Sequence, residues 1–379
     1  MSLHVGLDLL FVTGRAGGTE TYVRELLTAL RRLDPGLRFT GFCRPALQAA
    51  PPSWLAGVRL VPVDTALPGP LGWAAGEVVR LPRAVARAGV DVLHCPANFG
   101  PLTGEVPRVV TVHDLLHRRF PQLVPLPVRY GTRFLVDAAG RRADLVLTVS
   151  EASAADLQRY LGLPRERVVV TPPGAFHASS PGGGVEPEES VGPDARALLG
   201  LPDRPYVLSV GTGRPHKNLP RLVEALAILP AGGRPLLVLT GGGAQAELGP
   251  VARQHGVDGD VRYAGWVADD ALEALYRGAC AYVMPSLFEG FGLPVIEAMR
   301  RGVPVACSDI PVLREVAGDA AEYFDPMSAA SIAAALRQVV DDPRLRGRLV
   351  EDGAARAAAY TWDRTAELTL AAYVRAARG

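Results

Sequence analysis

The sequence predicts an α/β protein in which two parallel sheets are each covered by helices on both faces. Short runs of β-branched and aliphatic residues alternate with helical patterns along almost the whole chain, which is typical of βαβ units. The chain has 379 residues, enough for two or three domains. A tract of Gly, Pro, Ser and Glu without periodicity predicts a linker at 178–195. We therefore expect one domain over 1–177 and a second over 196–361.

The first half begins with a strand, a helix and a second strand. In the helix, residues 19–33, apolar side chains such as Tyr22, Leu26 and Leu30 recur at helical spacing, while charged residues take the opposite face. The strands expected in this half span 4–9, 39–42, 58–63, 91–94, 108–113, 145–150 and 168–172.

The alternation starts again after the linker. The strands expected here span 206–210, 236–240, 261–265, 281–286, 303–308 and 321–324. No repeat in the sequence relates the two halves, so their similarity is one of architecture. A ligand is expected in a cleft between them, at the carboxyl ends of both sheets.

Composition excludes several classes of protein. Apolar residues make up 48% and charged residues 21%, which argues against disorder. The net charge of +1 gives no field that would attract nucleic acid. Of the 40 basic residues only Lys217 is lysine, and asparagine occurs only at Asn98 and Asn218. GC-rich coding explains this scarcity and makes each of these residues informative.

The spacing of the cysteines and the lack of a targeting signal predict an intracellular enzyme. The four cysteines are far apart and no histidine stands at metal-ligand spacing, so neither a zinc site nor a disulfide framework is expected. The first residues lack the pattern of a signal peptide, and no run of about 18 apolar residues occurs. We expect a cytoplasmic protein.

The densest chemical signal lies in residues 286–305. A buried strand ends there, a loop with two glycines follows, and Pro294 suits the first turn of a helix. Backbone amides at such a helix start favour a phosphate or pyrophosphate. Glu289 in the loop and Glu297 on the helix add carboxylates that suit a polyhydroxylated ligand.

This segment resembles the signature of the family-4 (group 1) retaining, nucleotide-sugar-dependent glycosyltransferases with the GT-B fold. The resemblance extends over nearly the whole chain. Further motifs that carry it are GGTETYVREL, TVHDL, TVSE, VGTGRPHKNLPRLVEAL, LTGGG, YAGWV, SDIPVLREVAGDAAEYFDP and YTWDRTA. It implies two Rossmann-like domains that face a central cleft, with the C-terminal helix 362–379 packed back on the first domain.

The resemblance also implies roles for the residues of the signature. Glu289 would contact the donor sugar, and Glu297 would bind the ribose hydroxyls. The backbone of Val267 would lie against the base. The residues whose backbone would hold the sugar and diphosphate are Gly211, Gly290, Phe291, Gly292 and Leu293.

The loop after 206–210 supplies two candidate cations, Arg214 and Lys217. Either side chain can neutralise the charge that develops on a departing diphosphate. The family commonly places arginine where this chain has His216 or Thr212, so Arg214 departs from the pattern. A solvated loop is the alternative for both. Asn218 is expected to cap the helix that begins at Pro220.

The first half supplies fewer candidates. Gly17 and Gly18 open the first helix and would let the backbone approach the diphosphate or the acceptor, although a tight turn also explains them. The resemblance places His113 near the 6-hydroxyl of the donor sugar, and a buried core histidine is the alternative. His94, at the end of the strand 91–94, has a weaker case.

No metal or cofactor is expected. The sequence Asp-Gly-Asp at 258–260 looks like a metal motif, but it stands in the turn before a strand, where these residues are ordinary turn formers. GT-B enzymes do not use that motif. The expected partners are a nucleotide-sugar donor and a glycan, lipid-linked or small-molecule acceptor, without nucleic acid.

Residues 115–145 carry six arginines and two acids among apolar residues, a local charge of about +4. They predict an acceptor-side surface or peripheral contact with the cytoplasmic face of a membrane. A solvated face over packed helices explains them equally well.

The expected activity is transfer of a hexose with retention at the anomeric carbon. Mannose from GDP-mannose is the first choice of donor, followed by UDP-glucose and dTDP-rhamnose. Two alternatives remain at this point, a sugar-nucleotide-binding protein without turnover and a dinucleotide-dependent oxidoreductase. The oxidoreductase is disfavoured because the glycines after the first strand do not follow the G-x-G-x-x-G pattern and Arg44 stands near the end of the second strand.

Overall fold

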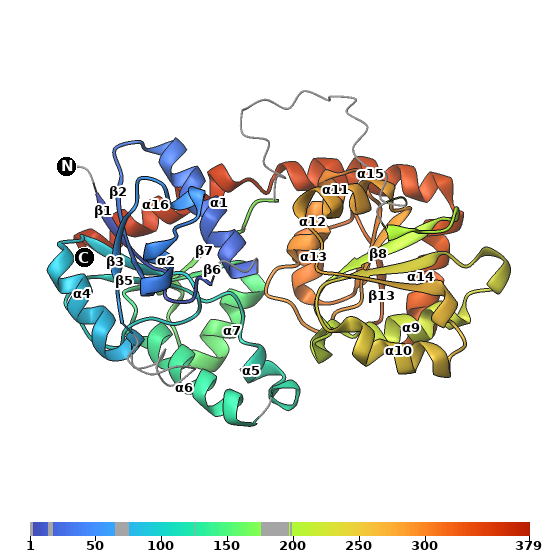
Figure 1. Cartoon of the computed structure of the whole chain (residues 1–379), viewed down its shortest axis with the longest axis horizontal. Helices are drawn as coiled ribbons and strands as arrows, with labels where there is room; N and C mark the ends of the chain where they lie inside the picture. The colour runs from blue at the N-terminus through green and yellow to red at the C-terminus, as the bar shows by residue number, and fades with distance from the viewer. Residues whose placement is uncertain (1–2, 14–17, 65–75, 125, 176–196, 198) are drawn as a thin grey trace. The chain divides into compact units, whose positions relative to one another are not determined.

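The chain forms two compact units, each with its own parallel sheet (Figure 1). The structure is a computed structural model that describes all residues except 1–2, 14–17, 65–75, 125, 176–196 and 198. The expected linker 178–195 lies outside the described residues. The N-terminal unit comprises Met1–Gly174 and Thr361–Gly379, and the C-terminal unit comprises Ala175–Tyr360.

The N-terminal unit is built on a seven-stranded sheet of order β3-β2-β1-β4-β5-β6-β7, in which all neighbours are parallel. Its strands are β1 (His4–Asp8), β2 (Arg38–Cys43), β3 (Arg59–Pro62), β4 (Val92–Cys95), β5 (Arg108–Thr111), β6 (Leu145–Thr148) and β7 (Val168–Val170). Its helices are α1 (Gly18–Leu33), α2 (Pro45–Ala49), α4 (Leu81–Ala88), α5 (Leu116–Arg119), α6 (Leu126–Arg142), α7 (Glu151–Leu161) and α16 (Trp362–Arg378).

The C-terminal unit has a six-stranded sheet of order β10-β9-β8-β11-β12-β13, also parallel throughout. Its strands are β8 (Tyr206–Val210), β9 (Leu236–Thr240), β10 (Val261–Gly265), β11 (Ala281–Met284), β12 (Val305–Ser308) and β13 (Glu322–Phe324). Its helices are α9 (Leu219–Ile228), α10 (Ala244–Gln254), α11 (Asp269–Gly278), α12 (Leu293–Arg300), α13 (Pro311–Ala317), α14 (Ala329–Asp341) and α15 (Pro343–Ala358). The α/β prediction is confirmed in both units.

The strands of both sheets have the buried, aliphatic character that is typical of parallel sheets. The central strands β1 and β11 are buried along their whole length, as expected where helices cover both faces. Within the described residues, no helix combines the length and the apolar character that a membrane span requires.

The last helix, α16, packs beside α1 in the N-terminal unit (Figure 1). Trp362 and Tyr373 are buried in the same apolar cluster as Leu26 of α1. The hydroxyl of Tyr373 lies 2.6 Å from Nδ1 of His94, and Nε2 of that histidine lies 2.7 Å from the hydroxyl of Thr111. The C-terminal segment is therefore an integral part of the N-terminal unit.

Candidate active site

The strand order of the C-terminal sheet reverses between β8 and β11. The chain proceeds from β8 to β9 and β10 on one side, and from β11 to β12 and β13 on the other. Open α/β sheets bind ligands at such a point, because the loops from the carboxyl ends of the two strands diverge there. The loop after β8 carries Lys217 and the loop after β11 carries Glu289, so both predicted side chains stand at the switch point.

Lys217 and Glu289 form an ion pair. Nζ of Lys217 lies 2.7 Å from Oε1 of Glu289, and the two side chains are only 19% and 11% exposed. The hydroxyl of the buried Ser286 donates to the same carboxylate oxygen at 2.6 Å. Two donors thus hold one carboxylate oxygen, while the pair places one positive and one negative group side by side.

Helix α12 begins directly after this loop. Gly292 precedes the helix with φ +100°, and a Cβ there would lie 2.6 Å from a methyl carbon of Leu313, so glycine is required twice over. The side chain of Phe291 is 5% exposed, with its ring centroid 5.4 Å from that of Tyr360. Phe291 therefore offers a ligand its backbone rather than its ring. The positive end of the α12 dipole faces the loop that carries Gly290.

Glu297 is largely buried. The residue is 8% exposed, and its Oε2 accepts a hydrogen bond of 3.1 Å from the hydroxyl of Tyr276. Burial raises the pKa of Glu297, against the opposing effect of the nearby Arg301 guanidinium. The Arg301 guanidinium also lies 4.8 Å from the centroid of the Tyr276 ring. Tyr276, which the sequence did not single out, thus fixes this carboxylate.

Glycines bring the loops after β8, β9 and β10 together. A Cβ on Gly241, which has φ +111°, would lie 2.3 Å from the carbonyl oxygen of Gly211. A Cβ on Gly242 would lie 2.6 Å from the indole nitrogen of Trp266. Val267 follows this exposed tryptophan and is half-buried. Bare backbone is therefore a steric requirement at Gly241, whereas at Gly242 the neighbour is the side chain of an exposed tryptophan.

Unlike Lys217, two other polar residues of this loop, Arg214 and Asn218, make no hydrogen bond or ion pair with Glu289 within the described residues. The exposed side chain of Arg214 forms no ion pair with any residue in the described part of the chain. Asn218 stands before α9, which begins at Leu219, but its side chain makes no capping hydrogen bond. The prediction of a capping role was wrong, because the amide nitrogen donates instead to the carbonyl oxygens of Pro285 at 3.0 Å and Pro326 at 2.8 Å.

His113 follows β5 in the N-terminal unit. Its Nε2 lies 2.8 Å from the carbonyl oxygen of Pro96, and because a carbonyl only accepts, Nε2 carries the proton. Its backbone N–H donates to Oδ1 of Asn98 at 2.7 Å. The ring meets Tyr22 edge-on at 4.9 Å between centroids. Burial lowers the pKa of His113, so the ring is neutral near pH 7 and Nδ1 is an acceptor.

Of the two glycines predicted at the start of α1, the structure describes only Gly18. Gly17 lies outside the described residues. Gly18 is the first residue of α1, and a Cβ there would meet no atom within 4 Å. Steric crowding within the described residues therefore does not explain Gly18.

Two weaker candidates, His94 and the 258–260 turn, have hydrogen-bond partners within the protein. His94 is fully buried between Thr111 and Tyr373. In the 258–260 turn, the Asp260 carboxylate accepts hydrogen bonds from Arg204 at 3.0 Å and Arg234 at 2.7 Å. This carboxylate thus has two cationic partners that account for it.

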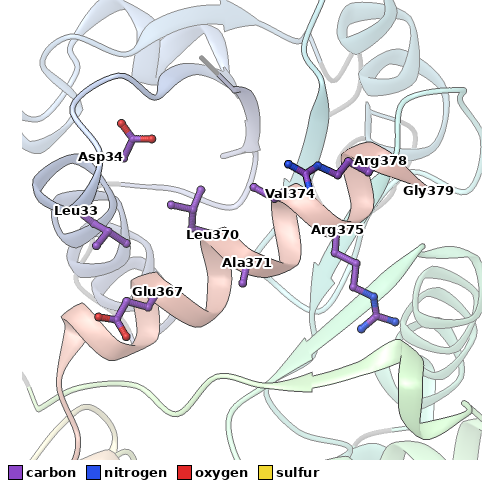
Figure 2. Close-up of a pocket in the computed structure, with 9 residues that line it drawn as sticks. All are labelled: Leu33, Asp34, Glu367, Leu370, Ala371, Val374, Arg375, Arg378 and Gly379. Carbon is purple, nitrogen blue, oxygen red and sulfur yellow. The ribbon is translucent and has the colours of Figure 1, made fainter. Parts of the chain in front are cut away.

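A shallow, open groove lies elsewhere, on the surface of the N-terminal unit (Figure 2). Among the described residues, none of the predicted site residues lines it. Its walls come from the end of α1 and from α16, and they are formed by Leu33, Asp34, Glu367, Leu370, Ala371, Val374, Arg375, Arg378 and Gly379.

Comparison with known proteins decides the family. Residues 194–356 match the family described as glycosyl transferases group 1, and residues 16–176 match glycosyltransferase family 4. The chain belongs to the group 1 glycosyltransferases. This confirms the resemblance and identifies the chain as a hexosyltransferase. The oxidoreductase alternative is thereby set aside.

Two relatives illustrate the similarity. An O-antigen chain mannosyltransferase B from Escherichia coli is 34% identical over 270 residues, which cover 70% of this chain and 69% of that protein. A D-inositol 3-phosphate glycosyltransferase from Xylanimonas cellulosilytica is 31% identical over 398 residues, which cover 97% and 93%.

Solved structures confirm the GT-B fold. Sucrose-phosphate synthase from Thermosynechococcus elongatus superposes with a TM-score of 0.77 at 23% identity, over 98% of both chains. The HepE protein of Anabaena, solved with UDP and glucose, superposes with a TM-score of 0.73 at 20% identity, over 98% of this chain and 99% of that one.

Proposed function

We propose that this glycosyltransferase moves a hexose from a nucleoside diphosphate sugar to an acceptor hydroxyl, with retention at the anomeric carbon. The observation that supports it most is the Lys217–Glu289 pair at the switch point of the C-terminal sheet, beside the start of α12. The acceptor is a glycan, a lipid-linked sugar or a small molecule.

The ion pair prepares the site for a charged donor. A diphosphate carries more negative charge than the single carboxylate of Glu289, and it also gains the amides before α12. Lys217 therefore exchanges its partner when the donor binds. Glu289 then keeps the Ser286 hydroxyl and turns its second oxygen to a hydroxyl of the sugar. Each partner keeps the other from standing as an unpaired charge in the empty site.

The reaction breaks the bond between the anomeric carbon and the diphosphate oxygen. A bond to the acceptor oxygen forms on the same face, and the acceptor proton passes to the departing diphosphate. Lys217 stabilises the negative charge that develops on this leaving group, with Arg214 as a second cation. The amides of Gly290 to Leu293 hold the sugar and diphosphate in place, and the described side chains supply orientation rather than a nucleophile. Because cationic side chains do this work, we propose no metal and expect full activity in EDTA.

The remaining predicted residues complete donor recognition. Glu297, oriented by Tyr276, would accept the ribose hydroxyls, and the backbone at Val267 and Gly211 would approach the base and the diphosphate. In the N-terminal unit, neutral His113 offers Nδ1 as an acceptor for the sugar 6-hydroxyl. Gly17 and Gly18 are proposed beside the diphosphate or the acceptor.

Mannose from GDP-mannose is the proposed donor, with UDP-glucose and dTDP-rhamnose as alternatives. Support comes from relatives named O-antigen chain mannosyltransferase B and serotype-specific mannosyltransferase WbdA, both from Escherichia coli. A membrane-bound, lipid-linked acceptor is proposed because α6 exposes an apolar stripe, Leu126, Tyr130 and Phe134, at intervals of four residues. Arg129 and Arg133 stand on the same helix. The enzyme would then work at the cytoplasmic face of a membrane.

Thermal stabilisation by a panel of nucleoside diphosphates and their sugars tests the donor. The guanosine series should raise the melting temperature most, and slow release of GDP from GDP-mannose without acceptor should follow. Release of nucleotide separates an enzyme from a binding protein without turnover. Glu289→Ala should abolish this release. It should also lower the melting temperature of the empty protein, because it leaves the Lys217 ammonium unpaired, but the loss of turnover should far exceed the loss of stability. A Glu289→Ala variant with the rate of the native protein would remove Glu289 from the site.

A further inference from the structure

Asn218 adopts a conformation that few residues tolerate. Its φ is +55°, and among the described residues only Asn98 shares a positive φ without being glycine. Asparagine accepts this left-handed region more readily than most side chains do. The chain contains two asparagines in 379 residues, and both stand at such positions.

The amide of Asn218 joins three loops. It follows the loop after β8, and its nitrogen donates to Pro285 O in the loop after β11 and to Pro326 O in the loop after β13. Both N–H groups of the amide are thereby used. Neither glycine nor aspartate can replace this function, because glycine has no donor and an ionised aspartate only accepts.

The residues on either side of Asn218 contact the same partner loop. The backbone oxygen of His216 accepts from the N–H of Leu287 at 2.8 Å. Lys217 reaches Glu289 at 2.7 Å. Three consecutive residues of one loop therefore bond to three positions of the other, with the lysine in the middle.

Asn218 is also linked to Glu289 through Pro285 and Ser286. Pro285, whose carbonyl it holds, directly precedes Ser286, and the hydroxyl of Ser286 donates to Oε1 of Glu289. Lys217 Nζ binds that same oxygen. The position of Asn218 is thus transmitted to both donors that meet at one carboxylate oxygen.

We infer that Asn218 is a positioning residue that fixes the distance and direction between the Lys217 ammonium and the Glu289 carboxylate. This inference rests on the proposed function of that pair. Asn218 itself does not touch the donor. It holds the two loops in register, so that the ammonium meets the diphosphate while the carboxylate meets the sugar.

Two variants separate the parts of this role. Asn218→Gly keeps the left-handed backbone but removes the amide, and Asn218→Asp keeps the shape but removes both donors. Each should lower kcat at least about tenfold, with donor KM changed less than about threefold. The matched control is Tyr206→Phe, at the first residue of β8. It removes a buried hydroxyl that donates to the Leu275 carbonyl oxygen at 2.8 Å. It should lower the melting temperature comparably and leave kcat within about twofold.

A second readout reports the pair directly. Because Lys217 is the single lysine of the chain, protein made with lysine carrying carbon-13 at the ε position, and with a lysine-free tag, shows one lysine resonance. In Asn218→Gly this resonance should move toward its position in Glu289→Gln, and Tyr206→Phe should leave it unchanged. Native kcat in both Asn218 variants, or an unmoved resonance, would overturn the inference. Full activity in Lys217→Ala and Glu289→Ala would instead overturn the proposed site.

Discussion

The ammonium of Lys217 lies 2.7 Å from Oε1 of Glu289, although 72 residues separate the two in sequence. The pair occupies the point where the C-terminal sheet reverses its strand order. Chemistry in open α/β sheets concentrates at this point. A compact ammonium shares the carboxylate oxygen with the Ser286 hydroxyl. A planar guanidinium has a different shape and hydrogen-bonding pattern, so it cannot reproduce this arrangement.

Lys217→Arg should therefore lower kcat at least about tenfold and weaken donor binding, although the charge is kept. Steady-state kinetics with the preferred donor measures both. The control is Arg221→Lys, which exchanges the same two residue types at a half-buried site, where Arg221 pairs with Glu224 at 3.5 Å. It should stay within about twofold of the native rate. Unchanged kinetics in Lys217→Arg would mean that the solitary lysine reflects only codon usage.

The Asn98 side chain should fix the position of His113, because its Oδ1 accepts a hydrogen bond from the backbone N–H of His113. Asn98→Gly keeps the positive φ of +67° but removes the Oδ1 that accepts from the His113 N–H, so kcat should fall about tenfold. Asn98→Asp keeps the acceptor and adds a negative charge, which should preserve most activity. That charge raises the pKa of His113, so the acidic limb of the pH–rate profile should move to higher pH. Equal activity losses in both variants, with no shift of the profile, would contradict this role.

His94 should make stability depend on pH. Burial lowers its pKa to about 3 in the folded state, against about 6.5 when unfolded. The unfolded chain then binds a proton that the folded chain refuses, so the free energy of unfolding falls as the pH drops from about 6.5 toward 3. At pH 5 the loss is about 2 kcal/mol.

Urea unfolding at pH 5 and pH 7 of the native protein and of His94→Asn isolates this contribution. Other titrating groups, such as Asp8 with its pKa raised by burial to about 6, remain in both proteins and cancel in the difference. The native protein should lose more stability than the variant by about 2 kcal/mol. Parallel losses would contradict the buried neutral histidine.

The stripe on α6 should mediate membrane binding. Replacing Leu126, Tyr130 and Phe134, which are 62%, 60% and 66% exposed, with serine should abolish sedimentation with anionic liposomes at low salt. The control replaces Ile228 and Met327, two exposed apolar residues of the C-terminal unit, with serine. It should sediment like the native protein. No sedimentation of the native protein at low salt would dispose of this surface.

The sequence predicted more of the fold than of the site. Each expected strand exists because continuous aliphatic runs such as 236–240 are unambiguous when both faces of a sheet are covered. Glu289 and Lys217 could be selected because glycines, a proline and a helical pattern surround the one, and scarcity distinguishes the other. Their mutual ion pair could not be predicted, because it depends on which loops the strand order brings together.

Side-chain direction was the other limit. A helix-start position made Asn218 look like a cap, but its left-handed backbone turns the amide toward Pro285 and Pro326. Spacing placed Glu297 on the helix after Glu289, but it did not reveal that the residue is largely buried or that the Tyr276 hydroxyl orients its carboxylate. Such outcomes depend on tertiary contacts that local patterns do not contain.

The central claim is that Lys217 leaves Glu289 for the donor diphosphate. The most direct test follows the single lysine resonance of the carbon-13-labelled protein during titration with GDP, GMP and GDP-mannose. GDP and GDP-mannose should shift it saturably, with a midpoint that matches their binding curves, and GMP should shift it far less. The Glu289→Gln protein should reach the same end position from a different start. A resonance that stays in place while GDP-mannose binds and turns over would contradict the account.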